Sequence, residues 1–151
     1  CRVICEGLKG RAYEGDPAEA VAVGAHAMFF PCGLGHMMGL DVHDMENLGE
    51  VWVGYDGQPK STQFGRKSLR LARPLEPGFV LTIEPGIILF ELIDYWKAEK
   101  RFKDFINYDK LESYRDFTGL RNEEDYLITE DGARLLGKKV PFTTEEVEAL
   151  R

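Results

Sequence analysis

Two histidines stand close together in "PCGLGHMMGLDVHD", residues 31–44, among three glycines, two aspartates and a cysteine. His36 and His43 are seven positions apart, so they are not the i, i+4 pair that binds zinc on a helix. On extended backbone an odd separation places them on opposite faces, with different roles. A bend among the glycines would instead bring both imidazoles to one cavity. For either histidine alone, the alternative is a hydrogen-bonded structural residue.

Glu84 is a further candidate site residue, a glutamate that directly follows the apolar stretch "VLTI" and precedes Pro85. Proline restricts the residue before it to extended backbone, so Glu84 shares one strand face with Val80 and Thr82. Burial of a carboxylate there is costly unless a cation accompanies it. The alternative is a strand-end glutamate that points into solvent.

Charged residues also alternate in "LRNEEDY", residues 120–126. On a strand, Arg121, Glu123 and Asp125 share one face, and Glu124 lies on the other. Glu123 is then the better inward carboxylate, although an ordinary charged edge strand gives the same pattern. One imidazole and two carboxylates on separate strands suit a hard or borderline divalent metal such as manganese. Three ligands alone do not identify such a site.

The order of three motifs is more specific: "GLGHMMGLDVHD", then "LTIEPG", then "LRNEEDYLITEDG". Together they resemble the pita-bread metallopeptidases, in the branch of the Xaa-Pro aminopeptidases and Xaa-Pro dipeptidases (prolidases), and the likeness extends over nearly all of the chain. The resemblance implies an α+β fold, the C-terminal half of the pita-bread domain, with a curved antiparallel sheet and helices on one side. Residues 1–151 are then a partial catalytic domain without its N-terminal part.

The resemblance also implies a site with two divalent metals, usually manganese, held by two aspartates, one histidine and two glutamates. By this likeness His36, Glu84 and Glu123 are metal ligands, with Glu84 close to the attacking water and Glu123 bridging both metals. His43 and Arg121 line the substrate site, so His43, Glu84 and Arg121 are the catalytic candidates. The substrate is a peptide with a bond to proline, cleaved by metal-activated water.

Several positions depart from the family pattern. The two aspartate ligands belong upstream of the histidine motif, but the acidic residues before His36 do not match their context: Glu6, Glu14, Asp16 and Glu19. Cys32 stands where a substrate-site histidine is usual, as in "PHGLGH", and Asn122 replaces a commonly apolar residue beside a ligand. We therefore expect the chain alone to be inactive as a peptidase.

Two other functions stay open. A pita-bread relative that has lost catalysis and serves as a binding or scaffolding module is favoured by Cys32 and Asn122, and disfavoured by the retained candidate site residues. Alternatively, the fold is kept with different chemistry, as in creatine-hydrolysing relatives that lack the metal pair. Methionine aminopeptidases fit less well, since "GHMMGLDVHD" is closer to the proline-specific branch.

Composition limits the partners. A net charge of -7 and a pI near 5.0 disfavour nucleic acid and anionic membrane surfaces, which require clustered Lys and Arg. No apolar run is long enough to span a membrane.

Three cysteines without a CxxC pair favour a reducing, cytoplasmic setting. The chain has no initiator Met, so we expect upstream sequence, and apolar surface left by the missing half should make the chain a homo-oligomer.

Local signals predict the elements that must position the site. Asp16, Pro17 and Gly24 bound a short helix, and Thr143 with Glu146 form a capping box. The remaining expectations come from hydrophobic periodicity and turn residues: helix in residues 1–10, strand and loop in 27–39, a surface loop in 54–68, strands in 79–83 and after Gly86, helix in 91–106, strand in 119–129, a turn and short strand in 130–137, and helix in 143–150.

Overall fold

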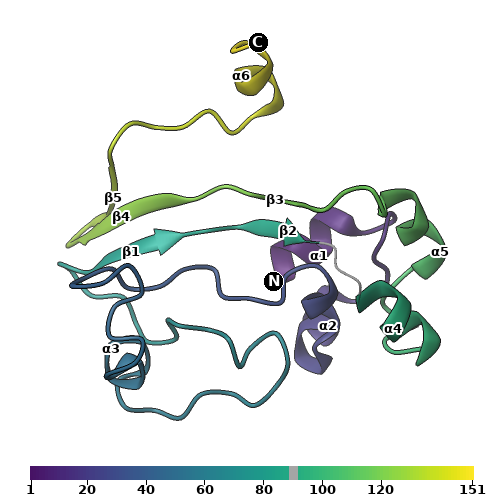
Figure 1. Ribbon diagram of the computed structural model, residues 1–151, viewed down its shortest axis with the longest axis horizontal. Coiled ribbons are helices and arrows are strands. Elements are labelled where there is room, and N and C mark those ends of the chain that lie inside the picture. Colours follow the sequence, from purple (N-terminus) through teal and green to yellow (C-terminus); the bar gives the residue numbers. More distant parts are fainter. Residues whose placement is uncertain (89–91) are drawn as a thin grey trace. The chain divides into compact units, whose positions relative to one another are not determined.

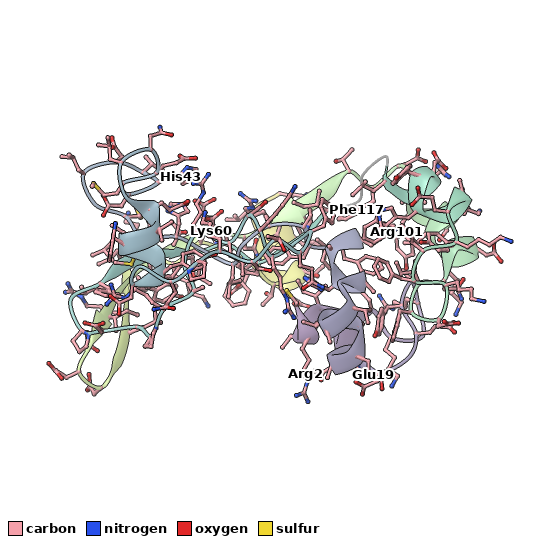
Figure 2. The ribbon with its side chains drawn as sticks, turned by 90° about the horizontal axis from the view of Figure 1, so that it is seen from below. Arg2, Glu19, His43, Lys60, Arg101 and Phe117 are labelled. Carbon is pink, nitrogen blue, oxygen red and sulfur yellow. The ribbon has the colours of Figure 1, made fainter. Side chains whose placement is uncertain are left out.

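The computed structural model describes residues 1–88 and 92–151, and these divide into two compact units. The first unit comprises Cys1–Gly33, Ser61–Ser68 and Gly86–Arg121, and the second comprises Leu34–Lys60, Leu69–Pro85 and Asn122–Arg151. Figure 1 labels the α-helices and strands along the chain, and Figure 2 draws the side chains on the same ribbon as sticks. No helix in the described ranges is long and apolar enough to cross a membrane.

The first unit is mostly helical. Its two short strands, β2 (Gly86–Ile88) and β3 (Gly119–Arg121), pair antiparallel. Its helices are α1 (Arg2–Leu8), α2 (Pro17–Val23), η1 (Ala25–Met28), α4 (Leu92–Ala98), α5 (Tyr108–Leu111) and η2 (Glu112–Tyr114). The apolar faces of these helices, except that of η2, meet in one core, whose largest fully buried side chains are Trp96, Tyr13, Phe29 and Met28.

The helix α2 shows how local sequence fixes one of these elements. The Asp16 carboxylate accepts hydrogen bonds from the backbone N–H groups of Ala18 and Glu19, both at 2.9 Å. These bonds satisfy two donors that have no partner within the helix. The helix ends at Gly24, whose φ of 95° is a left-handed conformation that favours glycine. The predicted helix over residues 16–24 is confirmed with both of its end signals.

The second unit is built on a three-stranded antiparallel sheet, in the order β1 (Val80–Ile83), β4 (Glu124–Thr129), β5 (Gly132–Leu136). In the register of β1 and β4, Val80 lies opposite Leu127 and Ile83 opposite Glu124. Two helices complete this unit: α3 (Glu50–Tyr55) and α6 (Thr144–Glu148). The capping box predicted for α6 is present in full.

Of the other local predictions, most are confirmed, one is wrong and one helix is missed. The helix near the start of the chain and the strands at 79–83, after Gly86 and at 132–136 are confirmed. The predicted strand at 27–30 is wrong, because Ala27 and Met28 belong to the 3-10 helix η1, and the buried Phe29 and Phe30 follow it outside any strand. The helix α3 was not predicted, and its last residues fall within the expected loop of 54–68.

Two long predictions were only partly right. The helix expected over residues 91–106 ends at Ala98, because Lys100 and Phe102 have positive φ and turn the chain away; residue 91 lies outside the described residues. The strand expected over 119–129 is interrupted at residues 122 and 123. The backbone N–H of Asn122 bonds instead to the Pro85 carbonyl, at 3.1 Å. Both misses arise where the backbone turns although the side-chain pattern continues.

Candidate metal and catalytic site

The first histidine motif runs beside strand β1 in the second unit. Three backbone hydrogen bonds hold residues 34–38 to it: Glu84 N–H to the Leu34 carbonyl (2.6 Å), Thr82 N–H to the His36 carbonyl (3.0 Å) and Met38 N–H to the Val80 carbonyl (2.9 Å). Gly35 lies at the point of closest approach. A Cβ there would come within 1.8 Å of the Thr82 carbonyl oxygen. The glycine before the histidine is therefore required by the pairing that brings His36 to Glu84.

His36 and Glu84 form a buried pair. His36 Nε2 lies 3.1 Å from Glu84 Oε1, and the two side chains are only 7% and 11% exposed. The other ring nitrogen, Nδ1, lies 3.1 Å from the Met37 carbonyl oxygen, which can only accept, so Nδ1 carries a hydrogen. If the imidazole is neutral, its Nε2 lone pair therefore faces a carboxylate oxygen. Two acceptors at this distance are compatible only with a proton or a cation beside them.

The same strand supplies Thr82, which links the pair. Its hydroxyl donates to Glu84 Oε1 at 2.6 Å and accepts from the His36 backbone N–H at 3.0 Å. Thr82 is 2% exposed and Glu84 is 8% exposed. The predicted shared face of Thr82 and Glu84 is confirmed, and the alternative of a glutamate turned into solvent is wrong.

The second histidine returns to the first through a bend. The rings of His36 and His43 lie edge to face, with centroids 4.4 Å apart and planes at 88°. The bend closes where the Asp44 N–H bonds to the Met37 carbonyl. A Cβ on Gly39 would lie 2.5 Å from the Asp44 carboxyl carbon. The glycine-bend alternative is thus the correct one, and the opposite-face alternative is not.

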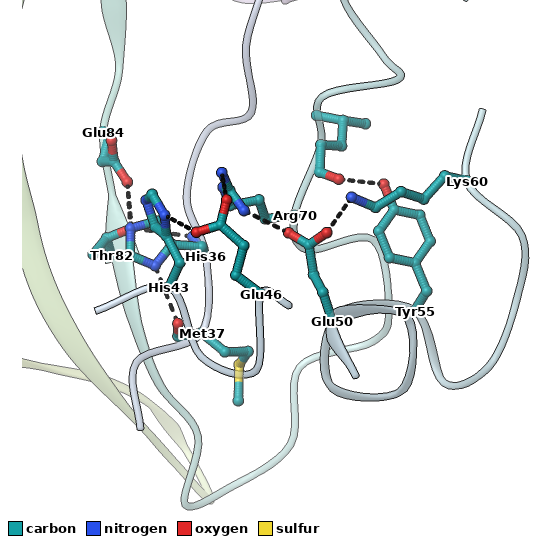
Figure 3. A network of polar contacts seen from close by, with 11 residues as sticks. His36, Met37, His43, Glu46, Glu50, Tyr55, Lys60, Arg70, Thr82 and Glu84 are labelled. Atoms are coloured by element: carbon teal, nitrogen blue, oxygen red, sulfur yellow. Dashed lines mark hydrogen bonds and ion pairs between the residues drawn. The ribbon is translucent and has the colours of Figure 1, made fainter. Parts of the chain in front are cut away.

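A chain of charged side chains continues from His43, as Figure 3 shows. His43 Nδ1 lies 2.8 Å from Glu46 Oε2, and Arg70 donates from Nη2 to Glu46 Oε1 at 2.6 Å and from Nη1 to Glu50 Oε1 at 2.8 Å. Lys60 forms an ion pair with Glu50. The hydrogen bond from His43, followed by that from Arg70, lowers the pKa of Glu46. We did not predict this network, whose only sequence signal is an acidic residue three positions after His43.

A cavity of about 470 Å³ opens beside His43 in the second unit. It is lined by Asp41, Val42, His43, Met45, Glu46, Asn47 and Leu48. The lining combines two carboxylates with apolar side chains, and Leu48 is 79% exposed. The second histidine therefore borders both the buried His36–Glu84 pair and an open, partly apolar space.

Glu123, the other carboxylate predicted as a ligand, is exposed and lies in the interruption before β4. Because the strand breaks there, the parity that placed it on one face with Arg121 does not hold. Glu124 begins β4 and accepts a hydrogen bond from the Tyr126 hydroxyl at 2.7 Å. In residues 1–88 and 92–151 no group of three or more His, Cys, Asp or Glu side chains is arranged to hold a metal ion. Glu123 as a ligand stays a prediction.

The last candidate, Arg121, belongs to the first unit, where it contacts Cys32. Arg121 Nη2 lies 3.8 Å from the Cys32 sulfur, with Arg121 on β3. Cys32, like Cys1 and Cys5, is a free thiol. A cysteine thus stands beside the arginine that the resemblance places in the substrate site.

The donor set fits part of a divalent metal site. One imidazole nitrogen and one carboxylate oxygen meet in a buried place, and both are ligand types that manganese and zinc accept. The bond from Nδ1 to a carbonyl is the usual second contact of a metal-binding histidine. Two donors do not complete a coordination shell, so His36 and Glu84 can supply only part of it.

Comparison with known proteins gives the chain its relatives. The sequence model of the family "Metallopeptidase family M24" matches residues 4–130 of this chain. The Xaa-Pro dipeptidase of Rattus norvegicus is 45% identical over 124 residues, which are 82% of this chain and 24% of that protein. A structure of aminopeptidase P from E. coli with the inhibitor Pro-Leu is 38% identical, with a TM-score of 0.64, and covers 99% of this chain and 26% of its own.

A second structure of the E. coli enzyme, with the same identity, coverage and TM-score, is described as zinc-substituted and in complex with product. The chain thus spans about a quarter of the length of the relatives that it matches. These likenesses confirm both the resemblance drawn from the three motifs and the predicted α+β fold class of the pita-bread enzymes.

Proposed function

The chain belongs to metallopeptidase family M24, and from that premise we propose that its protein hydrolyses the bond to proline in Xaa-Pro peptides, with two divalent metals in its site. The observation that carries the proposal is the buried contact between His36 Nε2 and Glu84 Oε1. Residues 1–151 are then part of a larger catalytic domain, consistent with a chain that spans 24% of its dipeptidase relative.

His36 and Glu84 hold the metals from this chain, with Glu123 as a third ligand. When bound, divalent cations acidify water and stabilise charge on the peptide oxygen. The two aspartates of the family set have no match among the acidic residues before His36. For that reason we propose that the 151-residue chain alone has no appreciable peptidase activity. We also propose that manganese is the metal of the complete site, because imidazole and carboxylate ligands suit a hard or borderline divalent ion.

The chain's own residues do the remaining work. A Glu84 carboxylate oxygen accepts the proton of the attacking water and passes it to the leaving nitrogen. His43 contacts the peptide at the scissile bond or its tetrahedral intermediate, and Arg121 binds the substrate. The nitrogen of an Xaa-Pro bond has no hydrogen to donate, so proline has to be recognised by the shape of a site, such as the space beside His43.

Replacement of the proposed base tests this function. In the purified complete protein with manganese, Glu84→Gln should lower the rate of Xaa-Pro peptide cleavage by about 10²- to 10⁴-fold, the usual contribution of a positioned base. Glu76→Gln is the matched control, because that glutamate is exposed and its partner is Arg73 in the same loop. A Glu84→Gln protein with unchanged turnover would contradict the proposal.

A non-catalytic binding module is the second candidate, and the contact of Cys32 with Arg121 favours it. The family histidine at this position can be a cation, whereas a thiol is a weak donor. The two candidates differ in one measurement on the complete protein: the binding module holds an Xaa-Pro peptide without cleaving it when manganese is present, whereas the enzyme releases the proline product.

We also propose that the protein is cytoplasmic and that it associates with further copies of itself. Large apolar side chains lie exposed on the second unit, with Leu40 at 90%, Leu48 at 79% and Trp52 at 72%. Apolar surface of this kind favours contact with another protein surface, which supports a homo-oligomer. Sedimentation of the purified chain at micromolar concentration should show species larger than a monomer, and a single monomeric species would contradict this part.

A further inference from the structure

The imidazole of His43 is held from one side by a carboxylate. Its Nδ1 lies 2.8 Å from Glu46 Oε2, and the two side chains are each 40% exposed. An ionised carboxylate only accepts hydrogen bonds, so His43 Nδ1 must be the donor. A hydrogen fixed on Nδ1 leaves Nε2 as the nitrogen that can exchange a proton or bond to a substrate.

The carboxylate is itself held in place. Arg70 donates to Glu46 Oε1 at 2.6 Å, so each oxygen of Glu46 has its own cationic or imidazole donor. The other end of the guanidinium bonds to Glu50 at 2.8 Å, and Glu50 pairs with Lys60. An arginine fixed by two carboxylates has little freedom to rotate. Glu46 therefore has one orientation toward the histidine.

We propose that Glu46 is a positioning residue for His43, which sets the hydrogen on Nδ1 and aims Nε2 at the reacting peptide, with Arg70 holding the carboxylate in place. This inference rests on the proposed function, because it gives His43 a role at the substrate. Figure 3 shows the arrangement: Glu46 lies between the histidine ring and the guanidinium, on the side of His43 away from Glu84.

A plain surface ion pair is the competing explanation, and fold stability alone does not separate the two. Exposed ion pairs contribute little to stability. A positioning role predicts an effect on turnover that passes through His43 and disappears when His43 is absent. A structural role predicts the same effect whether or not His43 is present.

The experiment compares two carboxylates on the same arginine. Glu46→Gln should lower kcat by about 10- to 100-fold, the effect usual for a group that orients a functional histidine, with KM changed little. A glutamine can donate as well as accept, so it no longer fixes the hydrogen on Nδ1. Glu50→Gln removes a carboxylate that bonds to Arg70 but not to His43, so it should lower kcat less than Glu46→Gln does.

A double variant decides whether the effect passes through the histidine. In a His43→Ala protein, adding Glu46→Gln should cause no further loss of kcat. An equal loss in both backgrounds would overturn the proposal, and so would a Glu50→Gln protein as slow as Glu46→Gln.

A spectroscopic readout separates this proposal from the proposed function. In the ¹⁵N-labelled protein, NMR of the His43 ring should show the hydrogen on Nδ1, and Glu46→Gln should shift the population toward the other tautomer. This readout needs no turnover. A tautomer shift in a protein that never cleaves Xaa-Pro peptides would uphold the role of Glu46 in orienting His43 while the proposed function failed. An unchanged His43 ring would overturn the role of Glu46 whatever the activity.

Discussion

Two buried histidines, one in each unit, differ in the groups that surround their ring nitrogens. His36 is 6% exposed, and its two ring nitrogens lie within 3.1 Å of the Met37 carbonyl and Glu84. His26 is 1% exposed, yet neither of its ring nitrogens has a hydrogen-bond partner in the described part of the chain. One imidazole is therefore surrounded by groups suited to a cation, and the other is enclosed as if it were apolar.

The surroundings of His26 explain its state. A Cβ on Gly65 would lie 3.3 Å from His26 Nε2, and the same segment is tied down by Gln63, which bonds to the Ala22 carbonyl, and by Arg66, which bonds to that of Val21. Burial, followed by the charge of Arg66, lowers the pKa of His26 to about 4. Burial together with a nearby positive charge thus keeps His26 neutral, whereas the carboxylate of Glu84 beside His36 suits a cation.

The strongest way to break this comparison is Gly35→Ala. The new methyl group would overlap the Thr82 carbonyl oxygen, at 1.8 Å, and backbone cannot move aside as a flexible side chain can. We expect a loss of about 3–5 kcal/mol in the free energy of unfolding, the range of severe steric or core defects. Urea denaturation monitored by circular dichroism measures it.

The control for this change is Gly7→Ala in α1, where a Cβ would meet nothing within 4 Å. In a helix, alanine is favoured over glycine by about 0.5–1 kcal/mol, so this variant should be slightly more stable. If Gly35→Ala were as stable as the parent, the pairing of residues 34–38 with β1 would not be what brings His36 to Glu84.

How much of the site follows from the sequence depends on the distance over which a signal acts. The shared face of Thr82 and Glu84 was predictable, because period two holds along a short regular strand. The sequence leaves it open whether His36 meets His43, since no periodicity encodes a bend among glycines. Glu123 was placed by a parity that the break at residues 122 and 123 removes.

The fold shows the same limit. Helix α2 was predicted from its Asp16 cap and Gly24 stop, which act within a single turn. The buried run at Ala27–Phe30 was predicted as a strand, because a short apolar run has the same appearance in a buried strand and a buried helix. Only the core of the first unit, which forms across distant segments, decides between them.

Acid should affect the first unit through His26. Its pKa is about 4 in the folded protein and 6.5 ordinarily, so between these values the unfolded chain binds a proton that the folded chain does not. Stability is therefore lost as pH falls from 6.5 toward 4, by about 3 kcal/mol at about 1.4 kcal/mol per pH unit.

The measurement is urea denaturation at pH 7 and at pH 4, for the parent and for His26→Leu. The leucine variant removes an unpaired buried polar group, so it should be at least as stable as the parent at pH 7 and lose less on acidification. Equal acid sensitivity in both proteins would show that His26 is not the group that titrates.

A change at Thr82 sharpens the other side of the comparison. Thr82→Val keeps the side-chain shape but removes the hydroxyl that bonds to Glu84 Oε1 and accepts from the His36 N–H. A buried donor left without its partner costs about 1–3 kcal/mol, so we expect a loss of about 2 kcal/mol. Thr129→Val is the control, because its hydroxyl bonds to the exposed Asp131 in the β4–β5 turn. A parent-like Thr82→Val would mean that the hydroxyl does not support the pair.

The smallest expected effect lies in the first unit, at the start of α2. Asp16→Ala removes the carboxylate oxygen that accepts from two backbone N–H groups, which then face solvent. Such caps contribute about 1 kcal/mol, so the loss should be near that value. Asp16→Asn retains an acceptor of nearly the same shape and should recover most of the lost stability.

Because the carbonyls of Val21 and Ala22 on this helix hold the segment that encloses His26, Asp16→Ala should also speed hydrogen exchange in residues 61–68. If exchange there is unchanged, the segment does not depend on α2 for its closure over His26.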